Sequence, residues 1–252
     1  MTEKIQKTIT PLMVGDNKLI GPIALFVEAA AVFKKDNLNF ILNTVFRAVA
    51  YLPVLIVSFL YVIIASVFQS DNLFLSLIFL LLTFVAWVAS VFLIVRLDIQ
   101  LFLFMKKSNN KFWDVWYQGA KYFWIYIALL LSMVIAIFLG SLLFILPGLI
   151  LAVFSSLVLC AAIFEDLKYG EAIKRGFSLV TKNWFGIFAR LILLVLAFFL
   201  VFFVIRIIFS FFSETGLFLL LHKMLSMAVF YLGYTFVIIY SSLIYKSSVG
   251  KK

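Results

Sequence analysis

The side chains that could carry out chemistry in this chain are few and widely spaced. It has one histidine, His222, and one cysteine, Cys160, so a zinc site or an intrachain disulfide cannot be assembled from them. No serine-hydrolase elbow, phosphate-binding glycine loop or dinucleotide fingerprint occurs in the sequence. We therefore expect a protein that is not an enzyme, with no catalytic residue, no metal and no cofactor. Cys160 is expected to be a small buried apolar residue.

Four polar residues near the ends of two long apolar stretches are the first candidates for a binding site. They are Arg206, Glu214, His222 and Lys223. An ionisable side chain at membrane depth is costly and usually faces a cavity or a partner. Arg206 and Glu214 could line a path for an anionic or protonatable solute. The alternative is that Arg206 and Lys223 extend to the outer headgroups while Glu214 is solvated in a turn.

A second set of polar residues surrounds a basic amphipathic stretch, and we expect it at the cytoplasmic membrane interface. It comprises Glu165, Asp166, Glu171, Lys174, Arg175 and Trp184. The first two carboxylates could pair with Lys174 or Arg175 and fix the following helix. They could equally form a solvated helix end.

Arg96 and Asp98 lie where another apolar stretch ends. For them we expect a local ion pair or a contact with lipid headgroups. An interfacial lipid-modifying enzyme that uses Arg96 or the two carboxylates is the enzymatic alternative.

The composition places these residues in a membrane. Hydrophobic residues make up 66% and charged residues 13% of the chain, against about 45–50% and about 25% in soluble domains. Apolar stretches occupy residues 41–68, 73–95, 122–146, 147–164, 185–209 and 217–245, and a bilayer crossing needs roughly 20 helical residues. We predict an all-α integral membrane helical bundle of six transmembrane helices, with Pro53 kinking the first.

This prediction makes residues 1–252 a single polytopic membrane domain. Residues 1–40 would form a cytoplasmic N-terminal segment with an interfacial helix, residues 41–245 the bundle, and residues 246–252 a cytoplasmic tail.

Lysine and arginine fall in alternate connections between these stretches. The connections around residues 70–72, 146–148 and 210–216 hold none, and Arg206 and Lys223 are the exceptions near their ends. By the positive-inside rule, both termini lie in the cytoplasm, and we expect a multi-pass protein of a bacterial inner membrane. The net charge of +10 flanks apolar spans, which argues against nucleic acid as a partner.

Each predicted outward hairpin is preceded by a short amphipathic stretch. The first covers residues 25–36, the second carries Trp113, Trp116, Tyr117, Ala120 and Trp124 on one face, and the third carries Ile173, Phe177, Val180 and Trp184. A helix with apolar groups on one side and cations on the other lies in the membrane interface. We expect three cytoplasmic interfacial helices and a unit of interfacial helix plus hairpin that is repeated three times.

Residues 147–191 carry a pattern of moderate specificity. Its features are Pro147 and Gly148 opening a span, Glu165 and Asp166 at its end, then Glu171, Ala172, Lys174, Arg175 and the run 179–184. The pattern resembles a bacterial polytopic membrane superfamily that includes the membrane domain of some glycerophosphodiester phosphodiesterases and stand-alone six-span inner-membrane proteins. The resemblance implies a fold and a location, and no catalytic residue is carried over.

Together these features favour a non-enzymatic membrane protein that handles lipid or a small solute, or that stabilises a membrane complex. The expected partners are membrane lipids and another membrane protein. A small-solute transporter with a polar path near the outer side of the last two spans is the first alternative. An interfacial lipid-modifying enzyme is the second.

Overall fold

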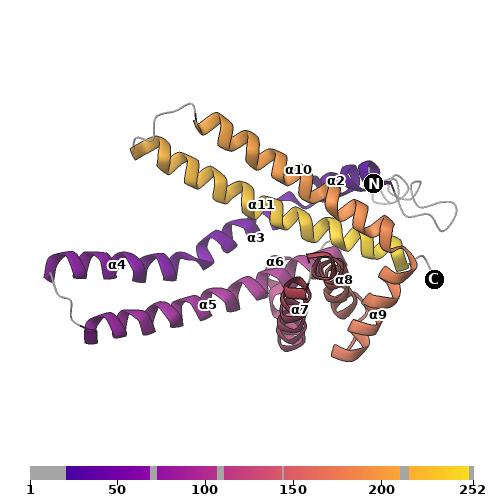
Figure 1. The fold of residues 1–252 in the computed structure, drawn as a ribbon, viewed down its shortest axis with the longest axis horizontal. Coiled ribbons are helices and arrows are strands. Elements are labelled where there is room, and N and C mark those ends of the chain that lie inside the picture. The colour runs from indigo at the N-terminus through magenta and orange to yellow at the C-terminus, as the bar shows by residue number, and fades with distance from the viewer. Residues whose placement is uncertain (1–20, 69–72, 107–110, 144, 211–215, 250–252) are drawn as a thin grey trace.

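The computed structural model of the protein is built from helices joined by short turns (Figure 1). It describes residues 21–68, 73–106, 111–143, 145–210 and 216–249, and these ranges contain no β-strand. The elements in chain order are α2 (Pro22–Lys35), α3 (Asn37–Ala50), α4 (Leu52–Phe68), α5 (Leu73–Lys106), α6 (Phe112–Gln118), the 3-10 helix η2 (Gly119–Tyr122), α7 (Phe123–Leu143), α8 (Ile145–Phe164), α9 (Tyr169–Lys182), α10 (Trp184–Ser210) and α11 (Gly216–Val249). The predicted all-α fold is confirmed.

Five segments of the described residues are helical, long and apolar enough to cross a membrane. They are Asn37–Ile64, Phe74–Lys106, Phe112–Leu142, Trp184–Ile207 and Leu225–Val249. The apolar segment Ile150–Phe164 of α8 is shorter than these five. The chain is therefore a membrane protein by the length and composition of its helices, and the predicted count of six spans is not confirmed.

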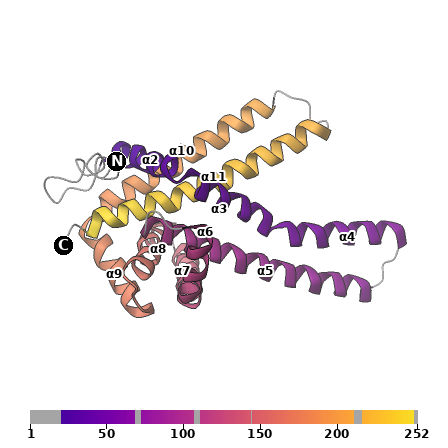
Figure 2. The ribbon, with the colours of Figure 1, turned by 180° about the vertical axis from the view of Figure 1, so that it is seen from behind.

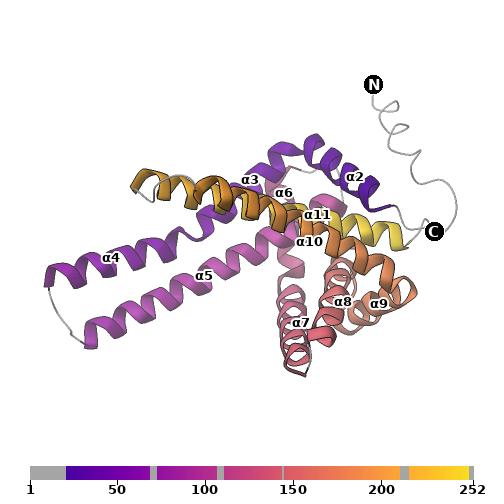
Figure 3. The same ribbon diagram turned by 45° about the horizontal axis from the view of Figure 1, so that its top comes forward.

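Pairs of neighbouring helices form three long hairpins that diverge from one end of the molecule (Figures 1 and 3). α4 packs along α5, α7 along α8, and α10 along α11. We call the region where α2, α6, α9 and the C-terminal ends of α5, α8 and α11 meet "the base" (Figure 2). Its core includes Leu101, Leu157, Ile163, Val180 and Ile244. Large apolar side chains farther along the hairpins, such as Phe74 and Leu80, are exposed, as lipid-facing residues would be.

The first predicted span is interrupted, as expected from its proline. α3 ends at Ala50, Tyr51 forms a turn, and α4 starts at Leu52 with Pro53 as its second residue. Proline cannot donate a backbone hydrogen bond, and it is tolerated in the first turn of a helix because the N–H has no partner there. The prediction of a break near Pro53 is confirmed.

α5 continues 11 residues past the predicted end of its span at Val95, whereas α11 passes its predicted end at Tyr245 by four residues. α5 and α11 have 34 residues each, which is about 50 Å at about 1.5 Å per residue and more than the roughly 30 Å of a hydrocarbon core. α5 therefore extends beyond the hydrocarbon core, and the end of the membrane span at Val95 stays a prediction. The helix continues to Lys106 because Leu97 and residues 99–105 are buried among the other base helices.

The three amphipathic stretches are helical, and each precedes a hairpin. α2 covers the first, α6 and η2 the second, and α9 most of the third. On α6, Trp113 and Tyr117 of the predicted aromatic face are exposed, whereas Phe112 and Val115 pack inward. Because the first hairpin is broken at Tyr51 and contains the 34-residue α5, while α7 has 21 residues, the equivalence of the three units stays a prediction.

α9 packs one side against the protein, and its placement in the membrane interface stays a prediction. Its buried residues Ala172, Gly176, Leu179 and Val180 belong to the contact with α8 and the base, and Phe177 stacks on Phe154 at a ring separation of 4.2 Å. A Cβ at Gly176 would lie 2.4 Å from Val158 Cγ2 and 2.9 Å from Val158 Cα. The absence of a side chain at Gly176 therefore allows the two helix backbones to approach closely.

We expect Gly176→Val to separate α8 from α9 and to destabilise the base, because neither backbone can move without breaking the buried contacts around it. The cost should be in the range of overpacked cores, about 1–3 kcal/mol. Thermal unfolding of the purified protein in detergent measures it. Gly170→Val is the matched control, since a Cβ at Gly170 meets nothing within 4 Å. Equal unfolding temperatures of the two variants would contradict the close approach.

Candidate functional site

A buried ion pair joins α3 to α5, and hydrogen bonds to its carboxylate add α7 and α11. The Arg47 guanidinium Nη2 on α3 lies 2.6 Å from Asp98 Oδ1 on α5, and the two side chains are only 2% and 5% exposed. The Tyr126 hydroxyl on α7 and the Tyr234 hydroxyl on α11 donate hydrogen bonds to Asp98 Oδ2 at 3.2 and 3.1 Å. One carboxylate thus receives donors from three other helices.

A set of amide side chains holds the arginine in place. Arg47 Nε donates to Asn43 Oδ1 at 3.1 Å, one helical turn earlier on α3. The Asn43 amide in turn donates to Gln100 Oε1 at 3.2 Å, and Gln100 Nε2 donates to the Phe112 carbonyl at 2.8 Å. The Arg47 guanidinium also lies over the Tyr234 ring, 4.6 Å from its centroid. We call Asn43, Arg47, Asp98, Gln100, Tyr126 and Tyr234 the ionic junction.

Burying the charges of the ionic junction costs free energy, and removing one partner of the pair would cost more. Removing two charges from water costs several kcal/mol each, and the attraction between them offsets this only when further hydrogen bonds satisfy the remaining donors and acceptors. The Tyr126 and Tyr234 hydroxyls donate to Asp98, and Asn43 Oδ1 accepts from Arg47 Nε, so both charged groups have further hydrogen bonds. An ionisable pair within membrane-spanning helices is a functional-site candidate by default.

The predicted local contact of Arg96 with Asp98 is wrong. Asp98 pairs with Arg47, whereas Arg96 Nη2 donates to the Trp116 carbonyl at 2.8 Å and its guanidinium lies 4.9 Å from the Trp116 ring centroid. Residues two apart on a helix point to different sides, because only those three or four apart share a face. Asp98 therefore faces the interior while Arg96 faces α6.

Sequence reasoning missed the ionic junction, although a signal for it exists. Asn43 and Arg47 are four residues apart within an apolar stretch, so they share one helix face, and that face also carries the buried Phe40 and Ala50. An arginine on the buried face of a membrane helix requires a carboxylate partner. The charge pattern along the chain groups Arg47 with the other cations that flank apolar stretches, and this pattern does not indicate a buried partner.

Of the two alternatives left open for the acidic end of α8, pairing or a solvated helix end, Glu165 adopts the pairing with Arg175. Arg175 Nε donates to both carboxylate oxygens of Glu165 at 3.0 Å, and Nη2 lies 2.9 Å from Oε1. This hydrogen bonding raises the pKa of the Arg175 guanidinium. The Tyr245 hydroxyl on α11 donates to the same carboxylate at 2.6 Å. Glu165 thereby ties α9 and α11 to the end of α8.

Asp166 pairs with cations other than the predicted ones. Lys106 Nζ lies 2.7 Å and Lys121 Nζ 3.4 Å from its carboxylate oxygens, and the Tyr122 hydroxyl donates to it. The hydrogen bond from Lys106, followed by that from Tyr122, lowers the pKa of Asp166 to about 2. Its backbone adopts a left-handed conformation with φ of 56°, which aspartate tolerates better than most residues. We call Glu165, Asp166 and their partners the acidic clasp.

The remaining interface residues have smaller parts. Glu171 accepts a hydrogen bond from the Lys168 backbone N–H at 3.2 Å at the start of α9, and Lys174 is exposed. Trp184 stacks on Phe188 with ring centroids 5.0 Å apart. Cys160 is fully buried in α8, as predicted.

The outer candidate site stays a prediction. Arg206 is exposed on α10. Glu214 lies outside the described residues, and so do the side chains of His222 and Lys223 within α11. Among the side chains that the structure describes, no three His, Cys, Asp or Glu residues come together as a metal site would require.

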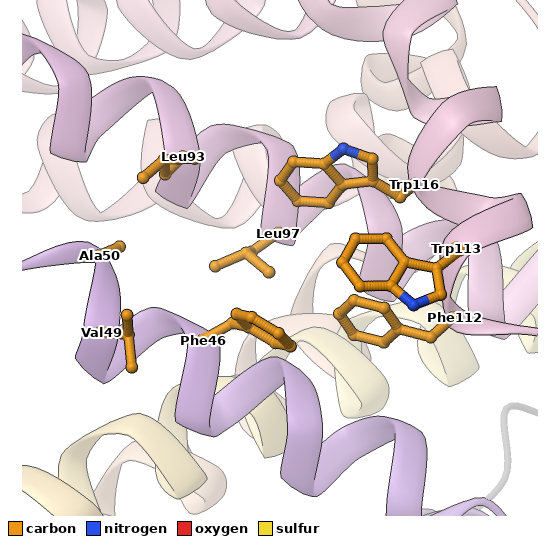
Figure 4. Close-up of a pocket in the computed structure, with 8 residues that line it drawn as sticks. All are labelled: Phe46, Val49, Ala50, Leu93, Leu97, Phe112, Trp113 and Trp116. Carbon is orange, nitrogen blue, oxygen red and sulfur yellow. The ribbon is translucent and has the colours of Figure 1, made fainter.

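An apolar groove lies on the surface between α3, α5 and α6, next to the ionic junction (Figure 4). It has a volume of about 170 Å³ and is lined by Phe46, Val49, Ala50, Leu93, Leu97, Phe112, Trp113 and Trp116. The Trp113 and Trp116 rings stand at one end and Leu93 and Ala50 at the other. Val49 is 45% and Trp113 58% exposed, so the groove opens to the surroundings. We call it the α3/α5/α6 groove.

Comparisons with known proteins do not assign a function to this arrangement. No family model, no curated protein and no solved structure matches the chain. The resemblance of residues 147–191 to a membrane superfamily therefore stays a prediction.

We expect Asp98→Asn to destabilise the protein by about 3–5 kcal/mol, because it leaves the Arg47 guanidinium buried without a counter-charge. Thermal unfolding in detergent, followed by tryptophan fluorescence, checks this. Asp114→Asn, at an exposed position of α6, is the matched control. The double variant Arg47→Met/Asp98→Leu should recover most of the loss, since it removes both charges. An unfolding temperature of Asp98→Asn equal to that of the control would show that the ion pair does not hold the helices.

Proposed function

We propose that this chain is a non-enzymatic, multi-pass protein of the bacterial cell membrane that binds phospholipid acyl chains in the α3/α5/α6 groove. The observation that carries the proposal is the groove itself. It is open at the surface, its lining is apolar, and two tryptophan rings form one end. A soluble ligand would require convergent polar groups, whereas an acyl chain requires only apolar walls.

The position of the groove along α5 supports a lipid occupant. Leu93 follows the first residue of α5, Leu73, by roughly 20 residues, or about 30 Å along the helix. That distance equals the thickness of a hydrocarbon core, so the groove lies at the edge of the core nearest the base. Tryptophan is enriched at this depth because its ring is apolar and its N–H is polar.

The charges of the base support the orientation expected from the sequence. Lys34, Lys35, Lys106, Lys121 and Lys246 all belong to helix ends or turns of the base. With the base in the cytoplasm, the three hairpins cross the bilayer outward and both termini are cytoplasmic. The groove then opens to the cytoplasmic leaflet.

We expect a phosphatidylcholine with a diazirine in its acyl chain to crosslink to the groove when the protein is held in nanodiscs. Peptides containing residues 46–50 and 93–97 should be labelled more strongly than the exposed apolar residues of α5 outside the groove. Val49→Trp should reduce this labelling several-fold, because an indole at this half-exposed position fills the groove. Mass spectrometry of the crosslinked peptides provides the measurement.

Val85→Trp is the control for this experiment, since Val85 is exposed on α5 and does not line the groove. Its labelling pattern should equal that of the unsubstituted protein. Uniform labelling along all exposed apolar faces, unchanged by Val49→Trp, would refute a lipid-binding groove.

A small-solute transporter is the second candidate, and the ionic junction favours it. Charged pairs within membrane helices mark substrate and proton paths in many transporters. A path from the outer side to Asp98 would pass Ser90, which precedes Asp98 by two helical turns on α5 and is 1% exposed.

If the chain is a transporter, water should reach the depth of Ser90 in at least one conformation. In a Cys160→Ala background, Ser90→Cys should then react with a membrane-impermeant thiosulfonate added from outside. Ser66→Cys, on the exposed outer part of α4, is the positive control. Protection of Ser90→Cys, with full reaction at the control position, would count against a path to the ionic junction.

A further inference from the structure

Arg96 is a partly buried arginine that has no carboxylate partner in the part of the chain that the structure describes. Arg47 and Arg175 form ion pairs at N···O distances of 2.6 and 2.9 Å, respectively. No carboxylate of the described residues lies within ion-pair distance of Arg96. Its one hydrogen bond to a described residue runs from Nη2 to the Trp116 carbonyl at 2.8 Å. A guanidinium has five N–H donors, so most of them remain for another acceptor.

Arg96 does not line the α3/α5/α6 groove itself but lies next to it, against one of its lining residues. It precedes Leu97 on α5, which lines the groove, and its guanidinium is 4.9 Å from the ring centroid of Trp116, which forms one end of it. Trp116 therefore contacts both the Arg96 guanidinium and the apolar interior of the groove. A ligand that contacted the Arg96 guanidinium and the groove at the same time would need an anionic group next to an apolar chain.

The depth of Arg96 fits a phosphate of the lipid headgroup. Arg96 is about 35 Å along α5 from its start at Leu73, just past the roughly 30 Å of hydrocarbon. From there the groove continues toward the bilayer centre, because Leu93 is nearer to the start of α5 than Arg96 is, and Val49 and Ala50 follow Phe46 toward α4. A lipid with its phosphate at Arg96 would direct an acyl chain along this lining.

We propose that Arg96 makes the groove selective for phospholipids whose headgroup carries a net negative charge. The inference rests on the proposed lipid-binding function and names the headgroup class. The planar guanidinium binds phosphate oxygens through two parallel N–H donors, which strengthens and orients the contact. A zwitterionic headgroup brings its own ammonium group close to the phosphate, and this cation competes with Arg96.

Competition between two photoactivatable lipids tests the proposal. The protein is placed in nanodiscs that contain equal amounts of phosphatidylglycerol and phosphatidylcholine, with the diazirine on one lipid or the other. We expect groove peptides to be labelled about fivefold more by phosphatidylglycerol, since one interfacial arginine is worth about 1 kcal/mol toward an anionic lipid. The preference should weaken as salt is raised.

Substitution of Arg96 tests whether this side chain causes the preference for phosphatidylglycerol. Arg96→Gln should bring the labelling ratio close to one while phosphatidylcholine still labels the groove. Arg96→Lys should retain part of the preference, because it keeps the charge and loses the paired donors. Lys174→Gln is the matched control, since it removes an exposed cation of the base on α9. It should leave the ratio unchanged.

The outcomes separate this inference from the proposed function. A ratio near one in the unsubstituted protein, or a preference that survives Arg96→Gln, overturns headgroup selection by Arg96 and leaves the lipid-binding groove standing. A preference lost equally in Lys174→Gln also overturns it, because the cause is then the general positive charge of the base. Absence of groove labelling by both lipids overturns the inference together with the proposed function.

Discussion

The ion pair between Arg47 and Asp98 limits how the helices around it can be arranged. Charges that are 2% and 5% exposed tolerate little displacement, because each partner would be left uncompensated in an apolar surrounding. α3 and α5 must therefore stay in contact at this point. The hydroxyls of Tyr126 and Tyr234 extend the same requirement to α7 and α11. α3, α7 and α11 thus each contribute a donor to the carboxylate that α5 carries.

This constraint explains the uneven distribution of contacts in the molecule. Below the ionic junction, the acidic clasp ties α8 to α5, α9 and α11, and a continuous apolar core fills the base. Beyond it, the hairpins diverge and expose apolar side chains along most of their length (Figure 3). Such side chains need no protein neighbour in a bilayer, where lipid tails surround them. The base therefore holds the parts together, and the hairpins meet the lipid.

The α3/α5/α6 groove is a product of the same arrangement. Asn43 binds the Leu97 carbonyl at 2.9 Å and Gln100 binds the Phe112 carbonyl at 2.8 Å, which sets α3 and α6 against α5. Phe46 and Leu97 adjoin the paired Arg47 and Asp98 in sequence and line the groove beside the ionic junction. Polar contacts in the interior thus position the apolar surface that we propose as a lipid-binding site, and Arg96 lies next to it.

Much of the fold could be predicted from the sequence, because the signals that carry it are local. Runs of about 20 apolar residues determine membrane helices, Pro53 determines the break in the first, and the spacing of charged and aromatic residues determines the short helices before each hairpin. The sequence also indicated the Glu165–Arg175 pair, whose members are close along the chain. The Arg47–Asp98 pair, the partners of Asp166 and the groove were decided by tertiary structure alone. Each of these features brings together residues that are far apart in the chain. The periodicity of apolar residues indicates which face of a helix is buried, but it does not indicate which other helix packs against that face.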